Sequence, residues 1–468
     1  MKTNRLIFPG FWFGKSSIDE AKELAALGVG GFCFYGGTSE ELKSLIDILQ
    51  SLAPHKLLMA ADYETGLGRW HEGLPVLPTN YTLGLAGRED LALKKGFLTA
   101  MQAREIGINW IFAPVVDLAD TPNNPIVNTR AFSADPKTVT RLAKAFSIGI
   151  SDGGCLNCFK HFPGHGSTKK DSHLTLPEVT KDLQHLKEED LQPYRDLITR
   201  ADSIMVSHLL VKCLDDKMPA SFSKKIITDL LRKTMFYKGL IVTDALTMKA
   251  TNGLNPIDAF KAGADVLLCP EDPFKTIKDL ADAVKKDSNL KENVFYSIST
   301  QEMMVARLNS THTLPCRNIE ISCRQLNKET AYTVLQKLNS QITFNKKNNI
   351  TYLILDEKAP EILPPFLTVL KENGFKLTPY KEGKQSTFLL ALNFDDYAAF
   401  KGTVNLNEKQ KELLQKALDK SKKSVLISFG SPYINEGING LGTFLPLASK
   451  GDNFQIAAAR NLCGFLNF

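Results

Sequence analysis

Eight short apolar runs alternate with longer helical patterns in the first 275 residues, and this alternation limits the possible folds most strongly. Such alternation is typical of a parallel sheet, and eight β–α units in about 270 residues are what a closed (β/α)8 barrel needs. We therefore predict an α/β protein with a TIM-type barrel at residues 1–275. The expected strands are Leu6–Trp12, Gly31–Tyr35, Leu57–Asp62, Asn109–Asp117, Leu156–His161, Ser203–His208, Leu240–Asp244 and Asp265–Cys269. The expected helices include Ser17–Leu27, Thr38–Leu52, Asp90–Ile106, Pro136–Asp152, Lys187–Arg200 and Lys224–Thr234.

A second, shorter α/β pattern follows the barrel. We expect a helical linker at residues 276–330 and a smaller α/β sandwich domain at residues 331–468. The segment Gly430-Ser-Pro-Tyr433 follows an expected strand of this domain. No other polar cluster stands out there, so a supporting role for the domain is predicted.

Polar residues capable of chemistry stand at the carboxyl ends of the barrel strands. All strands of a barrel point the same way, so these ends converge on the face where barrel active sites lie. The residues concerned are Asp62, Asp117, Lys160, His161, His208 and Asp244.

The segment Lys160-His-Phe-Pro-Gly-His-Gly-Ser-Thr-Lys-Lys-Asp-Ser-His173 has the highest density of such residues. Its glycines and proline predict a loop above the barrel. On a turn, Asp171 can reach the ring of His173, fix its tautomer and favour its protonated form. A solvated polar loop is the alternative, and the spacing alone leaves both open.

Asp244 follows the apolar run Gly239-Leu-Ile-Val-Thr. A carboxylate beside a buried strand is costly unless it is paired or functional. It is therefore a candidate catalytic group, although it could equally cap the helix that follows.

These segments resemble glycoside hydrolase family 3, and in particular its NagZ-like branch of β-N-acetylglucosaminidases. The resemblance covers about residues 5–275. Besides the histidine loop, it rests on Asp62-Tyr-Glu-Thr-Gly66 with Arg69, Phe112-Ala-Pro-Val-Val-Asp117, Asn128-Thr-Arg130-Ala-Phe-Ser-Ala-Asp135 and Phe236-Tyr-Lys-Gly-Leu-Ile-Val-Thr-Asp244-Ala-Leu-Thr-Met248. Thr65 and Ala245 depart from the family pattern, which has glycine and often aspartate there.

The resemblance implies a role for each matched residue. Asp244 would be the nucleophile of a retaining mechanism, and His173, oriented by Asp171, would be the proton donor. Residues implied to bind or surround the sugar are Asp62, Arg69, Arg130, Lys160, His161 and His208. It implies no metal and no cofactor.

Composition bears on partners and location. The net charge of +6 comes from 57 basic and 51 acidic side chains, without a basic run interleaved with aromatics, so no nucleic acid is expected. The sequence contains no run of about 18 apolar residues, so no membrane span is expected. Eight scattered cysteines fit reduced thiols. We expect a cytoplasmic enzyme, monomer or homodimer, acting on a small carbohydrate or muropeptide fragment of peptidoglycan.

Three other functions remain as alternatives. A phosphorylase could use the same site, because a neutral histidine does not repel an incoming phosphate. A metal-dependent hydrolase could use His161 and His165 with His173 or His208, although the loop does not place His-x-x-x-His on one helix face. A catalytically inactive barrel could serve as a binding module.

Overall fold

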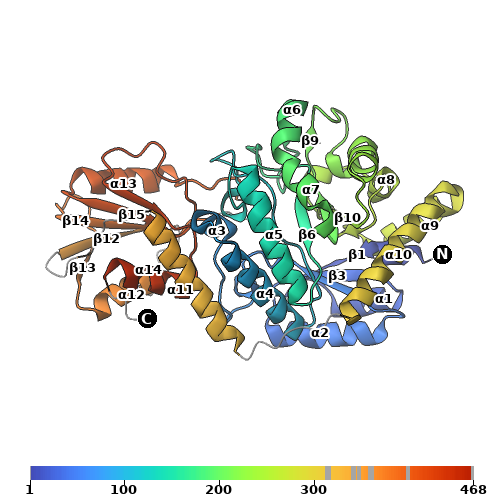
Figure 1. Ribbon diagram of the computed structural model, residues 1–468, viewed down its shortest axis with the longest axis horizontal. Coiled ribbons are helices and arrows are strands. Elements are labelled where there is room, and N and C mark those ends of the chain that lie inside the picture. Colours follow the sequence, from blue (N-terminus) through green and yellow to red (C-terminus); the bar gives the residue numbers. More distant parts are fainter. Residues whose placement is uncertain are drawn as a thin grey trace.

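The computed structural model describes residues 2–310, 318–338, 344, 349–356, 363–396 and 401–464. Figure 1 shows two parts side by side, a larger one from the first two-thirds of the chain and a smaller one from its end. The N-terminus lies at the far side of the larger part. Both parts are built from strands and helices in alternation.

Each of the eight expected strand regions of the larger part contains a strand. Pro9, which has no N–H to donate, separates the first region into two short strands. The strands are β1 (Ile7–Phe8), β2 (Gly10–Trp12), β3 (Gly31–Tyr35), β4 (Leu58–Ala61), β5 (Trp110–Ile111), β6 (Cys158–Phe162), β8 (Ser203–Val206), β10 (Leu240–Thr243) and β11 (Leu267–Leu268).

All pairings among these strands are parallel. The ladders have the orders β2-β3-β4-β5, β6-β8-β10 and β1-β11. Isolated bridges join Trp110 to Leu156 and Val242 to Val266, and so connect the ends of these ladders. The carboxyl ends of the strands therefore face the same way.

The helices between these strands follow from apolar periodicity and good caps. In α2 (Ser39–Leu52), Thr38 and Glu41 form a capping box, and Leu42, Leu45 and Leu49 are buried along one face. The expected helix Lys187–Arg200 is instead divided into a π-helical turn at Leu186–Asp190, α7 (Gln192–Leu197) and a 3-10 turn. The other helices of this part are α1 (Ile18–Ala26), α3 (Asn80–Ala86), α4 (Glu89–Glu105), α5 (Pro136–Asp152), α6 (Leu183–His185), α8 (Pro256–Ala262), α9 (Pro273–Lys286), α10 (Asn289–Ser310) and the π-helix Lys225–Thr234.

The smaller part contains a five-stranded parallel sheet with the order β13-β12-β14-β15-β16. One face packs against α13 (Glu408–Asp419), and the opposite face packs against α12 (Pro365–Glu372) and α14 (Asp452–Leu462). The helix α11 (Ile319–Lys337) contacts α14 as well as α3 and α4 of the larger part. The strands are β12 (Asn349–Leu355), β13 (Lys376–Pro379), β14 (Phe388–Asn393), β15 (Ser424–Ser428) and β16 (Thr443–Pro446).

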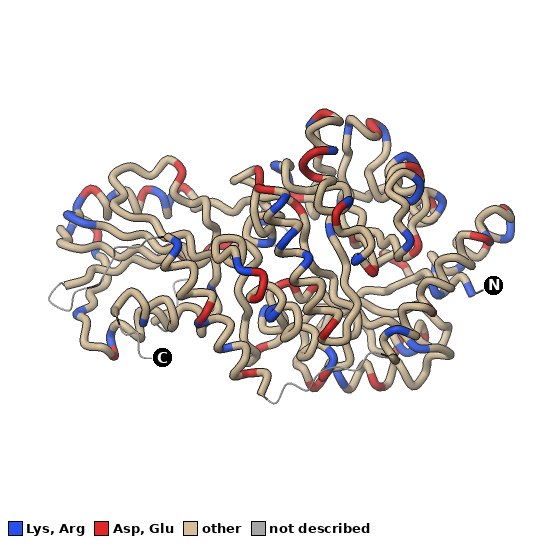
Figure 2. The backbone as a smooth tube through the Cα atoms, viewed as in Figure 1, with Lys and Arg blue, Asp and Glu red and all other residues tan. Residues whose placement is uncertain are grey.

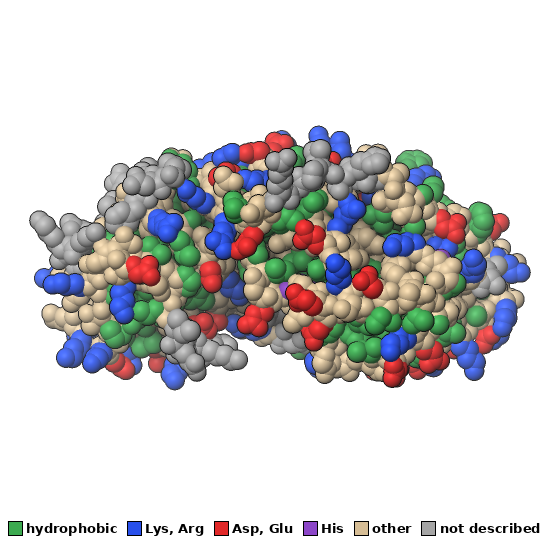
Figure 3. Space-filling model, turned by 90° about the horizontal axis from the view of Figure 1, so that it is seen from below, with side chains coloured by type: hydrophobic (Ala, Val, Ile, Leu, Met, Phe, Trp, Pro, Cys, Tyr) green, Lys and Arg blue, Asp and Glu red, His purple; other side chains and the backbone are tan. Residues whose placement is uncertain are grey.

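The surface carries both signs of charge over its whole length. Figure 2 shows basic and acidic residues interspersed along both parts of the chain. On the face in Figure 3, hydrophobic side chains lie between charged ones. Within the described ranges, no helix combines the length and the apolar character that a membrane span requires.

Candidate active site

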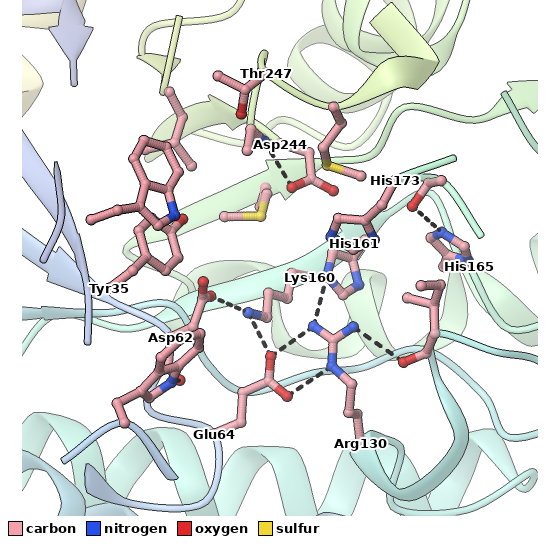
Figure 4. Close-up of a pocket in the computed structure, with 18 of the residues that line it drawn as sticks. Tyr35, Asp62, Glu64, Arg130, Lys160, His161, His165, His173, Asp244 and Thr247 are labelled. Carbon is pink, nitrogen blue, oxygen red and sulfur yellow. Dashed lines mark hydrogen bonds and ion pairs between the residues drawn. The ribbon is translucent and has the colours of Figure 1, made fainter. Parts of the chain in front are cut away.

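A cavity of about 520 Å³ opens at the carboxyl ends of the strands in the larger part. Asp62 directly follows β4, Lys160 and His161 belong to β6, and Asp244 directly follows β10. All four side chains line the cavity. The expected convergence of strand-end residues is thus confirmed for these positions. Figure 4 shows Asp244 near one end of the cavity, and Glu64 and Arg130 near the other.

Two cations and two carboxylates form a connected group on the cavity wall. Lys160 Nζ lies 2.6 Å from Asp62 Oδ1 and 2.7 Å from Glu64 Oε1. Arg130 donates to both oxygens of Glu64, at 2.7 and 2.9 Å. Burial opposes ionisation of Glu64, but Arg130 and Lys160 outweigh it and hold its pKa well below the usual range. Glu64 therefore remains charged and fixes both cations.

His161 is held from behind by a buried carboxylate. Its Nδ1 lies 2.6 Å from Asp117 Oδ2, and Asp117 also accepts the backbone N–H groups of His161 and His165. On its other side, Nε2 of His161 lies 3.2 Å from Arg130 Nη2. Burial raises the pKa of Asp117, but the neighbouring histidines and hydrogen bonds produce a net lowering. The carboxylate of Asp117 thus sets the orientation of the His161 ring.

Asp244 is an ionised carboxylate at the edge of a buried strand. Burial alone would raise its pKa, but the nearby His208 and His161 and the N–H of Ala245 lower it to about 2. The N–H of Ala245 donates to Asp244 Oδ1 at 2.8 Å. At neutral pH the side chain therefore presents a negative charge to the cavity.

His173 and Asp171 form the dyad that their spacing left open. Asp171 Oδ1 accepts the backbone N–H of His173 and lies 2.8 Å from the ring nitrogen Nδ1. Asp171 is 3% exposed, whereas the side chain of His173 is 25% exposed and lines the cavity. The carboxylate stabilises a proton on Nδ1, so the opposite nitrogen, Nε2, is the one suited to exchange a proton with a bound molecule.

The sequence places this cavity in a known family. Residues 1–299 match the family model described as the glycosyl hydrolase family 3 N-terminal domain. The chain belongs to glycosyl hydrolase family 3. Members of this family hydrolyse glycosidic bonds, so the chain is a glycosidase, and the resemblance seen in its motifs is confirmed.

Individual relatives extend this family assignment. A beta-hexosaminidase of Neisseria meningitidis serogroup B (strain ATCC BAA-335 / MC58) is 34% identical over 293 residues, which cover 59% of this chain and 79% of that protein. A family 3 beta-N-acetylglucosaminidase from Paenibacillus sp. str. FPU-7 matches 99% of this chain and 96% of its own at 24% identity, with a TM-score of 0.83. The beta-glucoside phosphorylase BglX bound to 2FGlc matches 100% and 92% at 20% identity, with a TM-score of 0.84. The two structural matches support the fold alone.

Most of the predicted site residues of this family 3 enzyme lie together. The cavity is lined by Asp62, Arg69, Arg130, Lys160, His161, His173 and Asp244, whereas Asp171 is buried beside His173.

His208 departs from the expectation that it lines the pocket. It is fully buried and is not among the residues that line the cavity. Its Nδ1 lies 2.6 Å from Ser221 Oγ, and its Nε2 lies 3.1 Å from the carbonyl oxygen of Ala245. The side chain therefore supports the segment that carries Asp244 from behind, through its contact with the carbonyl of Ala245.

Sequence reasoning assigned no site role to Glu64 or Asp117, and it missed an aromatic group at the cavity. Trp12 stacks on Tyr35 with ring centroids 4.9 Å apart, and Trp70 meets Tyr35 edge-on at 5.6 Å. All three aromatic side chains line the cavity. Flat aromatic faces beside polar groups are suited to the apolar face of a sugar ring. The strand-end position of Asp117 was a usable signal, and so was the position of Glu64 two residues after Asp62.

The metal-binding alternative meets a geometric obstacle. Both ring nitrogens of His165 have hydrogen-bond partners, with Nδ1 2.8 Å from Thr168 Oγ1 and Nε2 3.3 Å from Ser172 Oγ. Burial lowers the pKa of His165 to about 4, so the ring is neutral and held in the wall. Across the described ranges, no group of three or more His, Cys, Asp or Glu side chains is arranged to hold a metal ion.

Proposed function

We propose that this glycosidase is a retaining β-N-acetylglucosaminidase that removes terminal β-linked N-acetylglucosamine through a covalent intermediate. The observation that carries the proposal is an ionised Asp244 in the same cavity as a His173 ring bonded to Asp171. The names of the beta-hexosaminidase relative and the Paenibacillus beta-N-acetylglucosaminidase support the choice of sugar.

In the first step, a carboxylate oxygen of Asp244 attacks the anomeric carbon while the bond from that carbon to the leaving oxygen breaks. His173, protonated on Nε2, gives this proton to the leaving oxygen. The transition state carries positive charge on the sugar ring, which the carboxylate of Asp244 stabilises. The charge of Asp171 stabilises the imidazolium form that donates the proton.

In the second step, water attacks the anomeric carbon of the glycosyl-enzyme. His173 Nε2 accepts the proton of this water, and the bond to Asp244 breaks to restore the carboxylate. Two inversions at the anomeric carbon give retention of the β configuration. His173 thus acts first as acid and then as base, while Asp171 fixes its tautomer throughout.

The charged wall is assigned to sugar recognition. Asp62 accepts hydrogen bonds from sugar hydroxyls, and Lys160 and Arg130 donate to hydroxyls and to the N-acetyl carbonyl. His161 lines the same wall and accepts from Arg130. Arg69 lies exposed at the cavity and contributes at its rim. We further propose a cytoplasmic role, in which the substrate is a muropeptide fragment with N-acetylglucosamine linked to anhydro-N-acetylmuramic acid.

The same proposal includes a closed (β/α)8 barrel at residues 1–275, followed by a helical linker at 276–330 and a sandwich domain at 331–468. Closure is supported by the two bridges that join the ends of the parallel ladders. A separate buried cluster supports it as well, because every strand region contributes to it. Its members include Phe8, Cys33, Leu58, Trp110, Cys158, Met205, Val242 and Leu268.

Kinetics of two variants test the mechanism. We expect Asp244→Asn to lose at least about a thousandfold in kcat, because a neutral amide is a poor nucleophile. His173→Ala should lose far more with a disaccharide than with a nitrophenyl glycoside, since nitrophenolate leaves without a proton. A fluoro-sugar adduct on any residue other than Asp244 would refute the assignment.

The substrate and the acceptor are tested with the wild-type enzyme. We expect N-acetylglucosaminides to be cleaved in preference to glucosides. Hydrolysis gives free sugar, whereas the phosphorylase alternative gives sugar 1-phosphate when inorganic phosphate is added. If sugar 1-phosphate accumulated at the expense of free sugar, the reaction would be phosphorolysis and not hydrolysis. The roles proposed for Asp244 and His173 would be unaffected.

A further inference from the structure

The turn that carries Arg130 is buried between the two parts of the molecule. It is a single 3-10 turn, Asn128–Arg130, and Arg130 is its last residue. Asn128 and Thr129 are 1% and 0% exposed, and neither of them lines the cavity. Their side chains therefore point away from the sugar site while the next residue points into it.

Two hydrogen bonds tie this turn to the smaller part. Thr129 Oγ1 donates to Asp396 Oδ1 at 2.9 Å, and Asn128 Nδ2 donates to Ser431 Oγ at 3.2 Å. Asp396 lies just after β14 and Ser431 just after β15, so both come from the carboxyl edge of the C-terminal sheet. The first bond joins a hydroxyl to a buried carboxylate and is of the stronger, charge-assisted kind.

The backbone of the turn needs such support. Asn128 has a φ of +30°, in the left-handed region that non-glycine residues adopt only when their surroundings hold them there. On the other side, Asn80 Nδ2 donates to the backbone carbonyl of Arg130 at 2.7 Å. The backbone from which the Arg130 side chain starts is thus held by contacts outside the cavity, whereas Glu64 holds its guanidinium inside it.

The link to the smaller part continues through α3, which begins at Asn80. Thr79 Oγ1 and Thr82 Oγ1 each donate at 2.8 Å to a backbone carbonyl of the C-terminal domain, those of Ala448 and Leu447. Figure 1 shows α3 at the border between the two parts. Both sides of the Arg130 turn are therefore anchored in the same domain.

We propose that the C-terminal domain positions Arg130 for sugar binding, with Asp396 and Ser431 as the positioning residues. The proposal rests on the function assigned above, in which Arg130 contacts the sugar. It also gives a role to the segment Gly430-Ser-Pro-Tyr433, which the mechanism does not use. The domain thereby completes the sugar site of the barrel, although none of its described side chains lines the cavity.

A pair of substitutions at Thr129 tests the stronger bond. Thr129→Val keeps the shape but removes the donor, whereas Thr129→Ser keeps the hydroxyl. With nitrophenyl N-acetylglucosaminide we expect Thr129→Val to lower kcat/KM about tenfold, the factor that one hydrogen bond to a charged group contributes. Thr129→Ser should stay close to wild type. Ser431→Ala gives a second, independent variant with a smaller loss expected.

A double-mutant cycle separates positioning from a general loss of folding. In the Arg130→Ala background, Thr129→Val should cause no further loss of kcat/KM, because the group that it positions is gone. Asn405→Ala serves as the matched control. It removes a 2.7 Å bond across the same interface, to Asn123, that does not reach the Arg130 turn, and its kcat/KM should equal that of wild type.

Each of three possible results would refute a different part of the proposal. Wild-type kinetics of Thr129→Val and Ser431→Ala would refute the positioning role. An equal loss from Thr129→Val with and without Arg130 would refute its route through Arg130. Wild-type activity of Arg130→Ala would instead refute the assignment of Arg130 to the sugar site, and with it part of the proposed function.

Discussion

Replacing Glu64 with Gln should weaken the charged cavity wall, which lies apart from the proposed catalytic residues Asp171, His173 and Asp244. Glu64 is 5% exposed and receives Lys160 at 2.7 Å and Arg130 at 2.7 and 2.9 Å. Removing one partner of a buried ion pair costs about 3–5 kcal/mol. The lower end applies, because Asp62 still neutralises Lys160 and the Gln carbonyl still accepts one hydrogen bond. We therefore expect the free energy of unfolding to fall by about 3 kcal/mol.

The same substitution should also lower the activity, because Lys160 and Arg130 would no longer be held by Glu64. If two charge-assisted hydrogen bonds to the sugar weaken by about 1.4 kcal/mol each, kcat/KM falls about a hundredfold. Urea unfolding and steady-state hydrolysis of nitrophenyl N-acetylglucosaminide measure the two effects. The control is Glu382→Gln, which breaks the exposed 2.8 Å pair with Lys416 and should change neither quantity appreciably. If Glu64→Gln matched this control in both assays, the carboxylate would not hold the wall together.

Three further outcomes follow from the loop that carries His173. Asp171→Asn keeps the shape but removes the charge that supports the imidazolium form, so kcat for a disaccharide should fall about a hundredfold while a nitrophenyl substrate is less affected; equal losses would contradict this role. The pKa of His165 is about 4 in the folded protein and near 6.5 in the unfolded chain. The unfolded chain therefore takes up the proton first as the pH falls. Up to about 3 kcal/mol of stability is lost between about pH 6.5 and pH 4. His165→Asn should flatten that part of the stability profile measured by urea unfolding, and an unchanged profile would assign the loss to other groups. Gly166→Ala would place a Cβ 2.1 Å from the carbonyl oxygen of Leu118, so the loop must shift, and we expect about 1–3 kcal/mol of destabilisation with loss of activity; a variant with normal melting temperature and kcat would show that the loop adapts.

Local patterns were sufficient to predict most strands and helices. The leucines of α2 repeat at helical spacing and are buried, and the helix Pro136–Asp152 was expected with the bounds that it has. Errors occur where proline acts. Pro114 lies inside the expected strand Asn109–Asp117, of which only Trp110–Ile111 is a strand. Pro193 lies inside the expected helix Lys187–Arg200, which is divided there.

Only the residues of the candidate site that lie at strand ends or in recognisable motifs could be predicted from the sequence. Asp244, Lys160 and His173 were found because each stands at a strand end or in a dense polar loop. Glu64 was overlooked because its partner Arg130 is 66 residues away, and that pairing depends on loop paths that no local pattern encodes. The hydrogen bond from Thr129 to Asp396 could not be predicted for the same reason, because the two residues are 267 positions apart. We expect the last helix at residues 453–466 from its sequence pattern, and the last two of these positions lie outside the described residues.

The placement of the three tryptophans provides an optical probe of the enzyme. Trp12 and Trp70 line the cavity, whereas Trp110 is fully buried among the strands and donates to Ser203. Occupancy of the cavity by a sugar changes the hydration of the first two indoles and leaves the third untouched. Intrinsic fluorescence of a Trp110→Phe variant would then report ligand binding without the emission of the buried tryptophan. Because this signal needs no turnover, it can also be measured in a catalytically inactive background.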